Sequence, residues 1–179
     1  MPQIRRLPIV GVMGSGSQDH ADRAVPIGEW LARLGVHLLT GGGRGVMEAV
    51  SGAFHNVQDR KGLVIGILPG DGKARAIPGS GYPNSWVEIP IYTHLPLSGK
   101  KGTDPMSRNH LNILTSDVLI ALPGSEGTSS EVALALHYQR PLVAYLSSRE
   151  QIKNLSAEAF VTNDFAEVKK FVLSQIGSG

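Results

Sequence analysis

The sequence contains no cysteine among its 179 residues. The chain therefore cannot form disulfide bonds, and it cannot supply a thiolate nucleophile or cysteine ligands to an iron–sulfur cluster or zinc. A chain without cysteine is compatible with a reducing compartment, and we expect a cytoplasmic protein. Long apolar runs are also lacking, because glycine, proline, aspartate or arginine interrupts every candidate. We therefore expect no membrane-spanning helix.

Strong charge and several functional signatures are missing as well. The formal net charge is only +2, and the basic residues are scattered without aromatic neighbours. This composition argues against nucleic-acid binding but suits a small anionic ligand. The six histidines show no i, i+4 pairing and no carboxylate at metal-ligand spacing, so no metal site is expected. No Gly-x-Ser-x-Gly elbow is present to anchor a serine-hydrolase triad.

The apolar residues indicate one domain, residues 1–179, built around a parallel sheet. Hydrophobic residues make up 41% of the chain, enough for one sizeable core. Apolar runs bounded by glycine, without alternation, are typical of strands buried on both faces. Strands are expected at residues 9–13, 37–39, 64–68, 86–92, 118–122 and 142–146, and helices at 21–34, 46–55, 128–138 and 165–176. The pattern predicts an α/β Rossmann-like, doubly wound, mostly parallel sheet with helices on both faces, and irregular loops across 70–107.

Three glycine-rich turns follow predicted strands, at residues 14–17, 40–45 and 123–128. Tight turn geometry alone accounts for any one of them. A helix that follows such a turn exposes unpaired N–H groups with partial positive charge, and glycine lets a phosphate approach them. Three turns at one sheet edge therefore predict an anion cradle. The expected ligand-binding residues in the turns are Gly14, Ser15, Gly16, Ser17, Gly42, Gly43, Arg44, Gly45, Gly124, Ser125, Glu126, Gly127 and Thr128.

The common nucleotide fingerprints do not match these turns. In the first turn, Asp19 stands where a dinucleotide-binding fold has its third glycine, and no ribose-binding acid follows the second strand. Neither Lys73 nor Lys100 is followed by serine or threonine, so no P-loop is present. We expect neither NAD binding nor ATP hydrolysis of the P-loop type.

Three charged residues near the turns each allow two interpretations. Arg108 could clamp a phosphate with its guanidinium fork, or could begin a helix in solvent. Glu131 closes a capping box with Thr128, or could bind a sugar hydroxyl and assist glycosidic cleavage. Arg44 is favoured as a ligand contact, because a glycine turn has no packing need for arginine.

Residues 40–47, Thr-Gly-Gly-Gly-Arg-Gly-Val-Met, and residues 123–131, Pro-Gly-Ser-Glu-Gly-Thr-Ser-Ser-Glu, carry a family resemblance. Over about residues 8–150 the chain resembles the LOG-like superfamily, once described as lysine decarboxylases. The resemblance implies a Rossmann-like fold, a phosphate over the second motif, and a homodimer or higher homo-oligomer. LOG enzymes split a nucleoside 5′-monophosphate such as AMP into free base and ribose 5-phosphate, which implies catalytic roles for Arg108 and Glu131. Their Met-His-Glu-Arg-Lys segment reads Met-Ser-Arg-Asn-His here, at residues 106–110.

A second branch, the molybdenum cofactor carrier proteins, is similar at Arg108-Asn109-x-x-Asn112 and at residues 127–136. This likeness implies storage and transfer of the cofactor, a phosphorylated pterin, without catalysis. The likeness also implies that Arg108, Asn112 and Glu131 bind the cofactor. Molybdoenzymes or cofactor-insertion proteins are the partners that it implies. Three hypotheses follow: a carrier, which leads; a phosphoribohydrolase; and a nucleotide-sensing regulatory domain, for which the chain offers no fused partner domain.

Overall fold

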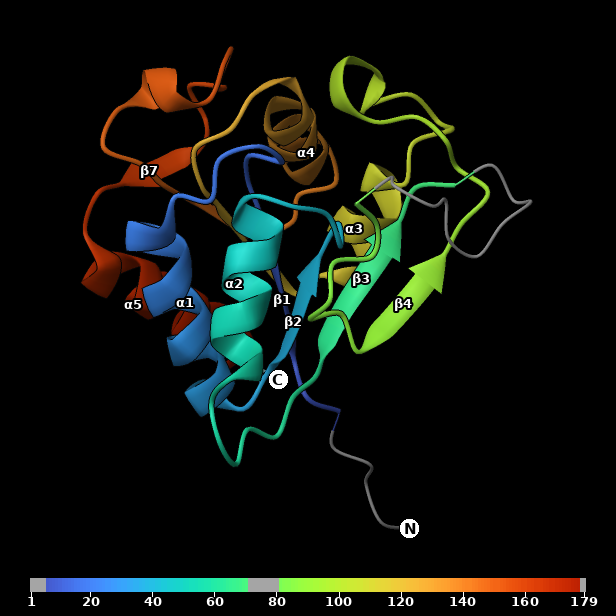
Figure 1. The fold of residues 1–179 in the computed structure, drawn as a ribbon. Helices are drawn as coiled ribbons and strands as arrows, with labels where there is room; N and C mark the ends of the chain where they lie inside the picture. The colour runs from blue at the N-terminus through green and yellow to red at the C-terminus, as the bar shows by residue number, and fades with distance from the viewer. Residues whose placement is uncertain (1–5, 71–80, 178–179) are drawn as a thin grey trace, which may run out of the picture.

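Seven parallel strands form one sheet in the computed structural model, which describes residues 6–70 and 81–177 (Figure 1). The strands are β1 Ile9–Met13, β2 His37–Thr40, β3 Val64–Leu68, β4 Ile89–Tyr92, β5 Val118–Ala121, β6 Leu142–Tyr145 and β7 Phe160–Thr162. Their order is β4-β3-β2-β1-β5-β6-β7, and every neighbouring pair is parallel. The predicted doubly wound α/β fold is confirmed.

The helices lie on both faces of the sheet (Figure 1). They are α1 Ala21–Leu34, α2 Val46–His55, α3 Asn109–Thr115, α4 Glu126–His137 and α5 Phe165–Ile176, with short 3₁₀ turns η1 Gly99–Lys101 and η2 Arg149–Gln151. One core cluster joins α1, α2 and α5 to the sheet, and a second joins α3 and α4 to it. Because successive strand residues point to opposite faces, Leu38 belongs to the first cluster and Leu39 to the second. Burial on both faces of the sheet explains why apolar and polar residues do not alternate along the central strands.

The strand order reverses between β1 and β5. From β1 the chain builds β2, β3 and β4 outward, then crosses over to place β5 on the other side of β1. The pair is in register from Val10 opposite Val118 to Met13 opposite Ala121, so the two strands end together. In open α/β sheets ligands bind outside the carboxyl ends of the strands at such a reversal. The fold therefore brings the first and third glycine turns to one place.

Most predicted elements agree with the structure to within one residue at each end, and larger differences occur at β4, α4 and β7. β4 begins at Ile89 rather than at residue 86, because Trp86 packs on Gly52 of α2 and its N–H donates to Asn84 Oδ1 in a turn. α4 begins at Glu126 rather than at residue 128. β7 was not predicted, since three residues carry too little periodicity to detect. Part of the expected irregular segment, residues 71–80, lies outside the described residues.

Two features are absent from residues 6–70 and 81–177. In these ranges, no helix combines the length and the apolar character needed to cross a bilayer. The same residues contain no group of three or more histidine, aspartate or glutamate side chains placed to hold a metal ion.

Candidate functional site

The first two glycine turns pack directly against each other. Val46 N–H, at the start of α2, donates to Ser15 O at 2.9 Å. A Cβ on Gly14 would lie 2.8 Å from Val46 Cγ1, and a Cβ on Gly45 would lie 2.3 Å from Ser15 O. Gly45 also has a φ of 64°, which favours glycine. These two glycines are therefore needed for close packing, whatever the site binds.

The third turn joins the first across the ends of β1 and β5. Leu122 N–H donates to Met13 O at 2.8 Å, and Ser15 N–H donates to Pro123 O at 3.0 Å. A Cβ on Gly124 would lie 2.0 Å from Thr128 Oγ1, so this glycine too is required by packing. By contrast, a Cβ on Gly16 would meet only Met47 Cε, at 3.7 Å. Gly16 thus borders open space.

That open space is a cavity of about 220 Å³, called here the Arg108 cavity. The predicted residues that line it are Gly14, Ser15, Gly16, Arg108, Ser125, Gly127, Thr128 and Glu131. Residues that the sequence analysis did not select complete it: Met13, Met47, Tyr82, Ser98, Gly99 and Asn109. Tyr82, Ser98 and Gly99 come from the irregular segment before α3, where no motif marks them. The structure thus gathers about half of the predicted residues around one cavity.

Among the residues that the structure describes, Arg108 is the one cation that lines the cavity. It occupies the N-cap position of α3, only 4% exposed, and its guanidinium carbon lies 5.9 Å from the Tyr82 ring centre. Its Nε and Nη1 atoms are buried and have no hydrogen-bond partner among the described residues. Burying a charged group without a partner is costly, so this guanidinium is suited to an anion that enters the cavity.

Glu131 lies in the same cavity and is not a helix cap. Because α4 begins at Glu126, Glu131 sits beyond the first turn, and the predicted capping box with Thr128 is wrong. Its side chain is buried, and Asn112 Nδ2 donates to Glu131 Oε1 at 3.3 Å. Burial raises the pKa of Glu131, although the charge of Arg108 and the Asn112 hydrogen bond oppose this rise. Arg108 and Glu131 therefore share one buried cavity, and each affects the charge state of the other.

The N-terminus of α4 supplies further donors. Ser125 is the N-cap residue, and its side chain makes no capping hydrogen bond. The N–H groups in the first turn, which include those of Gly127 and Thr128, are therefore left for another acceptor. A Cβ on Gly127 would approach nothing closer than 3.8 Å, so a ligand atom has access there. A buried arginine beside an uncapped helix start is an arrangement that binds a phosphate group.

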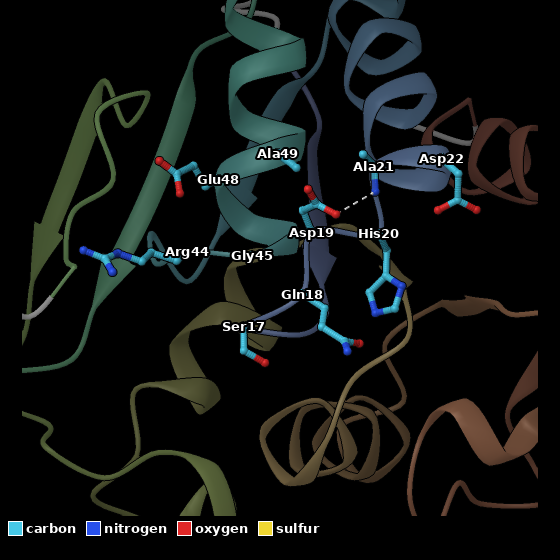
Figure 2. A pocket seen from close by; sticks show the side chains of 10 residues that line it. All are labelled: Ser17, Gln18, Asp19, His20, Ala21, Asp22, Arg44, Gly45, Glu48 and Ala49. Carbon is cyan, nitrogen blue, oxygen red and sulfur yellow. Dashed lines mark hydrogen bonds between the residues drawn. The ribbon is translucent and has the colours of Figure 1, made fainter.

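The remaining predicted residues lie elsewhere. Ser17, Arg44 and Gly45 line a separate hollow of about 810 Å³, called here the outer hollow. Figure 2 shows Arg44 just before α2 and Glu48 on that helix, with Gln18, Asp19 and His20 on the loop that leads into α1. The structure does not place Arg44 in the Arg108 cavity.

The other predicted residues have packing or surface contacts of their own. Gly42 has a φ of 72°, and a Cβ on Gly43 would lie 2.8 Å from Met47 Cε. Asn112 supports Glu131 from behind the cavity wall. Glu126 turns to the surface, where it pairs with Lys153 Nζ at 2.7 Å. Gly124, as described above, packs on Thr128.

Comparison with known proteins identifies a family. The model of the SLOG cluster4 family matches residues 7–171. An uncharacterized protein of Archaeoglobus fulgidus is 32% identical over 133 residues, which cover 73% of this chain and 75% of that protein. Among solved structures, the molybdenum cofactor binding protein of the phototrophic bacterium Rippkaea orientalis is 32% identical with a TM-score of 0.73, covering 96% of this chain and 98% of that one. The Moco carrier protein of Chlamydomonas reinhardtii is 31% identical with a TM-score of 0.70, covering 94% of this chain and 99% of that one.

Proposed function

The chain belongs to the SLOG cluster4 family, and from that premise we propose that it binds molybdenum cofactor as a carrier, holding the phosphorylated pterin and handing it on unchanged. The observation that carries this proposal is Arg108, buried and with Nε and Nη1 unpartnered, beside the uncapped start of α4. Two solved structures of similar sequence, at 32% and 31% identity, are named as proteins that bind or carry this cofactor.

The residues of the Arg108 cavity suit the phosphate end of such a ligand. The guanidinium of Arg108 can form charge-assisted hydrogen bonds with phosphate oxygens, and the N–H groups of the first turn of α4 can supply more. The chain has no cysteine, so it offers no thiolate to the metal of the cofactor. Binding would therefore use the phosphate, the pterin and the oxo groups. Release to a molybdoenzyme or insertion protein would then require no covalent bond to break.

The test is a calorimetric titration of purified molybdenum cofactor into the wild-type protein and Arg108→Gln. Losing the charged hydrogen bonds should weaken binding by about 1.5–3 kcal/mol. Arg33→Gln is the matched control, because Arg33 is exposed on α1, where it pairs with Glu29 at 3.3 Å. Equal affinities of wild type and Arg108→Gln, with melting temperatures showing both folded, would contradict the proposal. We also expect a homo-oligomer, which size-exclusion chromatography would reveal.

A second candidate is a nucleoside 5′-monophosphate phosphoribohydrolase. The observation that favours it is that Arg108 and Glu131 line one cavity, with a pKa of Glu131 raised by burial. A carboxyl group whose pKa is raised by burial is suited to proton transfer at a glycosidic bond. If the protein is this enzyme, it releases free base from AMP, and Glu131→Gln abolishes the release while AMP still binds. Absence of base release from the wild-type protein would reject this candidate.

A further inference from the structure

The Arg108 cavity is too small for a whole phosphorylated pterin. Its volume is about 220 Å³, whereas pockets that hold small organic ligands usually measure about 300–1,000 Å³. The outer hollow, of about 810 Å³, lies within that range. Gly16 lines the cavity and the next residue, Ser17, lines the outer hollow. Because consecutive Cα atoms are about 3.8 Å apart, the loop after β1 is a wall shared by the two spaces.

The two spaces differ in charge. The described residues that line the outer hollow include the carboxylates Asp19, Asp22 and Glu48 and one arginine, Arg44. Of the three carboxylates, only Asp22 forms an ion pair within the described residues, with Arg23 at 3.9 Å. The described residues hold no cluster of acidic and histidine side chains that could bind a metal ion, so these carboxylates are spread along the wall. A surface rich in acceptors suits a group that carries N–H donors rather than an anion.

Asp19 is an exposed carboxylate that one hydrogen bond ties to the start of α1. Its Oδ1 accepts a hydrogen bond from Ala21 N–H at 3.3 Å, and its Oδ2 has no hydrogen bond among the described contacts. Figure 2 shows the side chain between the starts of α1 and α2. Ser15 Oγ accepts from the N–H groups of Ser17 and Gln18, at 3.2 and 3.0 Å, which fixes the preceding part of the loop. Asp19 is thus positioned to receive a ligand on one side.

We propose that the outer hollow binds the ring of the ligand, and that Asp19 recognises a heterocycle with an amino group and a ring N–H side by side. A carboxylate has two acceptor oxygens that match such a pair of donors. Pterin and guanine both present this edge beside their oxo group, and adenine does not. The inference deepens the proposed function and rests on it, since Arg108 must hold the phosphate of the same ligand.

GMP and AMP test this inference, because they share the phosphate and differ in the ring edge. Both are titrated into the wild-type protein, Asp19→Asn, Arg108→Gln and the control Glu29→Gln, while free base is monitored to detect hydrolysis. Asparagine keeps an oxygen that can accept from Ala21 N–H, so Asp19→Asn should fold. We expect the wild-type protein and Glu29→Gln to prefer GMP by about tenfold or more. Asp19→Asn should lose this preference with its AMP affinity unchanged, and Arg108→Gln should weaken both nucleotides equally.

The outcomes separate the inference from the proposed function. Equal binding of GMP and AMP, both weakened by Arg108→Gln, would overturn the role of Asp19 and leave the phosphate site in place. A GMP preference that survives in Asp19→Asn would also overturn it. Binding of neither nucleotide at millimolar concentration would reject the ring subsite, while the cofactor titration would still decide the proposed function. Nucleotide and cofactor binding that is insensitive to Arg108→Gln would overturn the phosphate site itself.

Discussion

Gly41 lies directly against the guanidinium group of Arg108. A Cβ on Gly41 would stand 2.1 Å from Arg108 Nη1 and 2.6 Å from Nη2. Gly41 is not among the residues with positive φ, unlike Gly42 and Gly45 in the same turn. Glycine is therefore needed at this position because it has no side chain, and not because of an unusual backbone conformation. Gly41 therefore determines where the buried positive charge lies.

Gly41→Ala should weaken ligand binding without unfolding the protein. The new methyl group would displace the end of a flexible side chain and would strain no backbone. We expect affinity for the anionic ligand to fall by about 1 kcal/mol or more, approaching the 1.5–3 kcal/mol typical of a charged hydrogen bond. Calorimetry and a melting curve would measure the two effects. Gly177→Ala, outside the site, is the control, and unchanged affinity in Gly41→Ala would show that the position of the guanidinium is not critical.

Glu131→Gln should change stability in a pH-dependent way. Burial raises the pKa of Glu131 above its ordinary value of 4.5, against the charge of Arg108 and the Asn112 hydrogen bond. The folded protein thus keeps a proton that the unfolded chain loses, so this contribution to stability is complete below about pH 4.5 and is lost as pH rises through the raised pKa. Glutamine resembles the protonated acid and does not titrate. Urea unfolding should show similar stabilities of the two proteins at pH 4 and a more stable variant at pH 8. A difference that is the same at both pH values would refute the assignment.

The sequence was sufficient for the sheet and most of the helices, because burial leaves a clear pattern. The run at residues 64–68 is apolar throughout, and β3 is buried on both faces. Short elements give no such pattern, as β7 shows. The start of α4 was misplaced because Thr128 and Glu131 form a good local capping signature. Other contacts override it: Thr128 lies against Gly124 in the preceding turn, and Glu131 accepts from Asn112 of α3.

The site was only partly predictable for a related reason. Glycine motifs indicate where a chain turns, but the same residue serves for packing, for positive φ or for ligand access. In the structure, Gly14, Gly45 and Gly124 serve packing, while Gly16 and Gly127 border open space. Which role each one has depends on which segment faces it across the sheet edge. That information is long-range, so the sequence pattern does not contain it.

Arg44→Ala tests whether the two spaces bind different parts of one ligand. The sequence predicts that Arg44 contacts the anion, and in the structure Arg44 lines the outer hollow whereas Arg108 lines its own cavity. We expect Arg44→Ala to lower affinity for the whole cofactor, by up to about 1.5–3 kcal/mol. Its affinity for inorganic phosphate should match that of the wild-type protein. Competition titrations with phosphate would decide this, and an equal loss for both ligands would place Arg44 at the anion after all.

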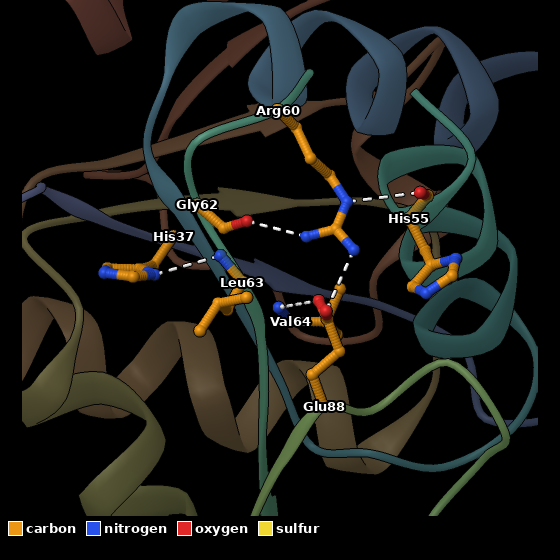
Figure 3. A network of polar contacts seen from close by, with 7 residues as sticks. All are labelled: His37, His55, Arg60, Gly62, Leu63, Val64 and Glu88. Atoms are coloured by element: carbon orange, nitrogen blue, oxygen red, sulfur yellow. Dashed lines mark hydrogen bonds and ion pairs between the residues drawn. The ribbon is translucent and has the colours of Figure 1, made fainter. Parts of the chain in front are cut away.

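Glu88→Gln should lower stability without affecting binding. At the amino ends of β3 and β4, Arg60 donates to His55 O at 3.1 Å, Gly62 O at 2.7 Å and Glu88 Oε1 at 2.9 Å (Figure 3). Glu88 Oε2 also accepts from Val64 N–H at 2.9 Å. This network lies at the amino ends of the strands, and the Arg108 cavity lies at their carboxyl ends.

The pH dependence of Glu88→Gln should be opposite to that of Glu131→Gln. Partial burial raises the pKa of Glu88, but the hydrogen bonds from Arg60 and Val64 and the charge of Arg60 outweigh it, so the pKa lies below its usual 4.5. The stability that the carboxylate contributes is therefore present above pH 4.5 and is lost as pH falls through the lowered pKa. We expect Glu88→Gln to cost about 1–3 kcal/mol at pH 7 and little at pH 2, measured by urea unfolding. Glu29→Gln, which removes an exposed ion pair, should cost less than about 1 kcal/mol at pH 7. A cost for Glu88→Gln that does not shrink in acid would mean that the ionised carboxylate is not what stabilises this edge.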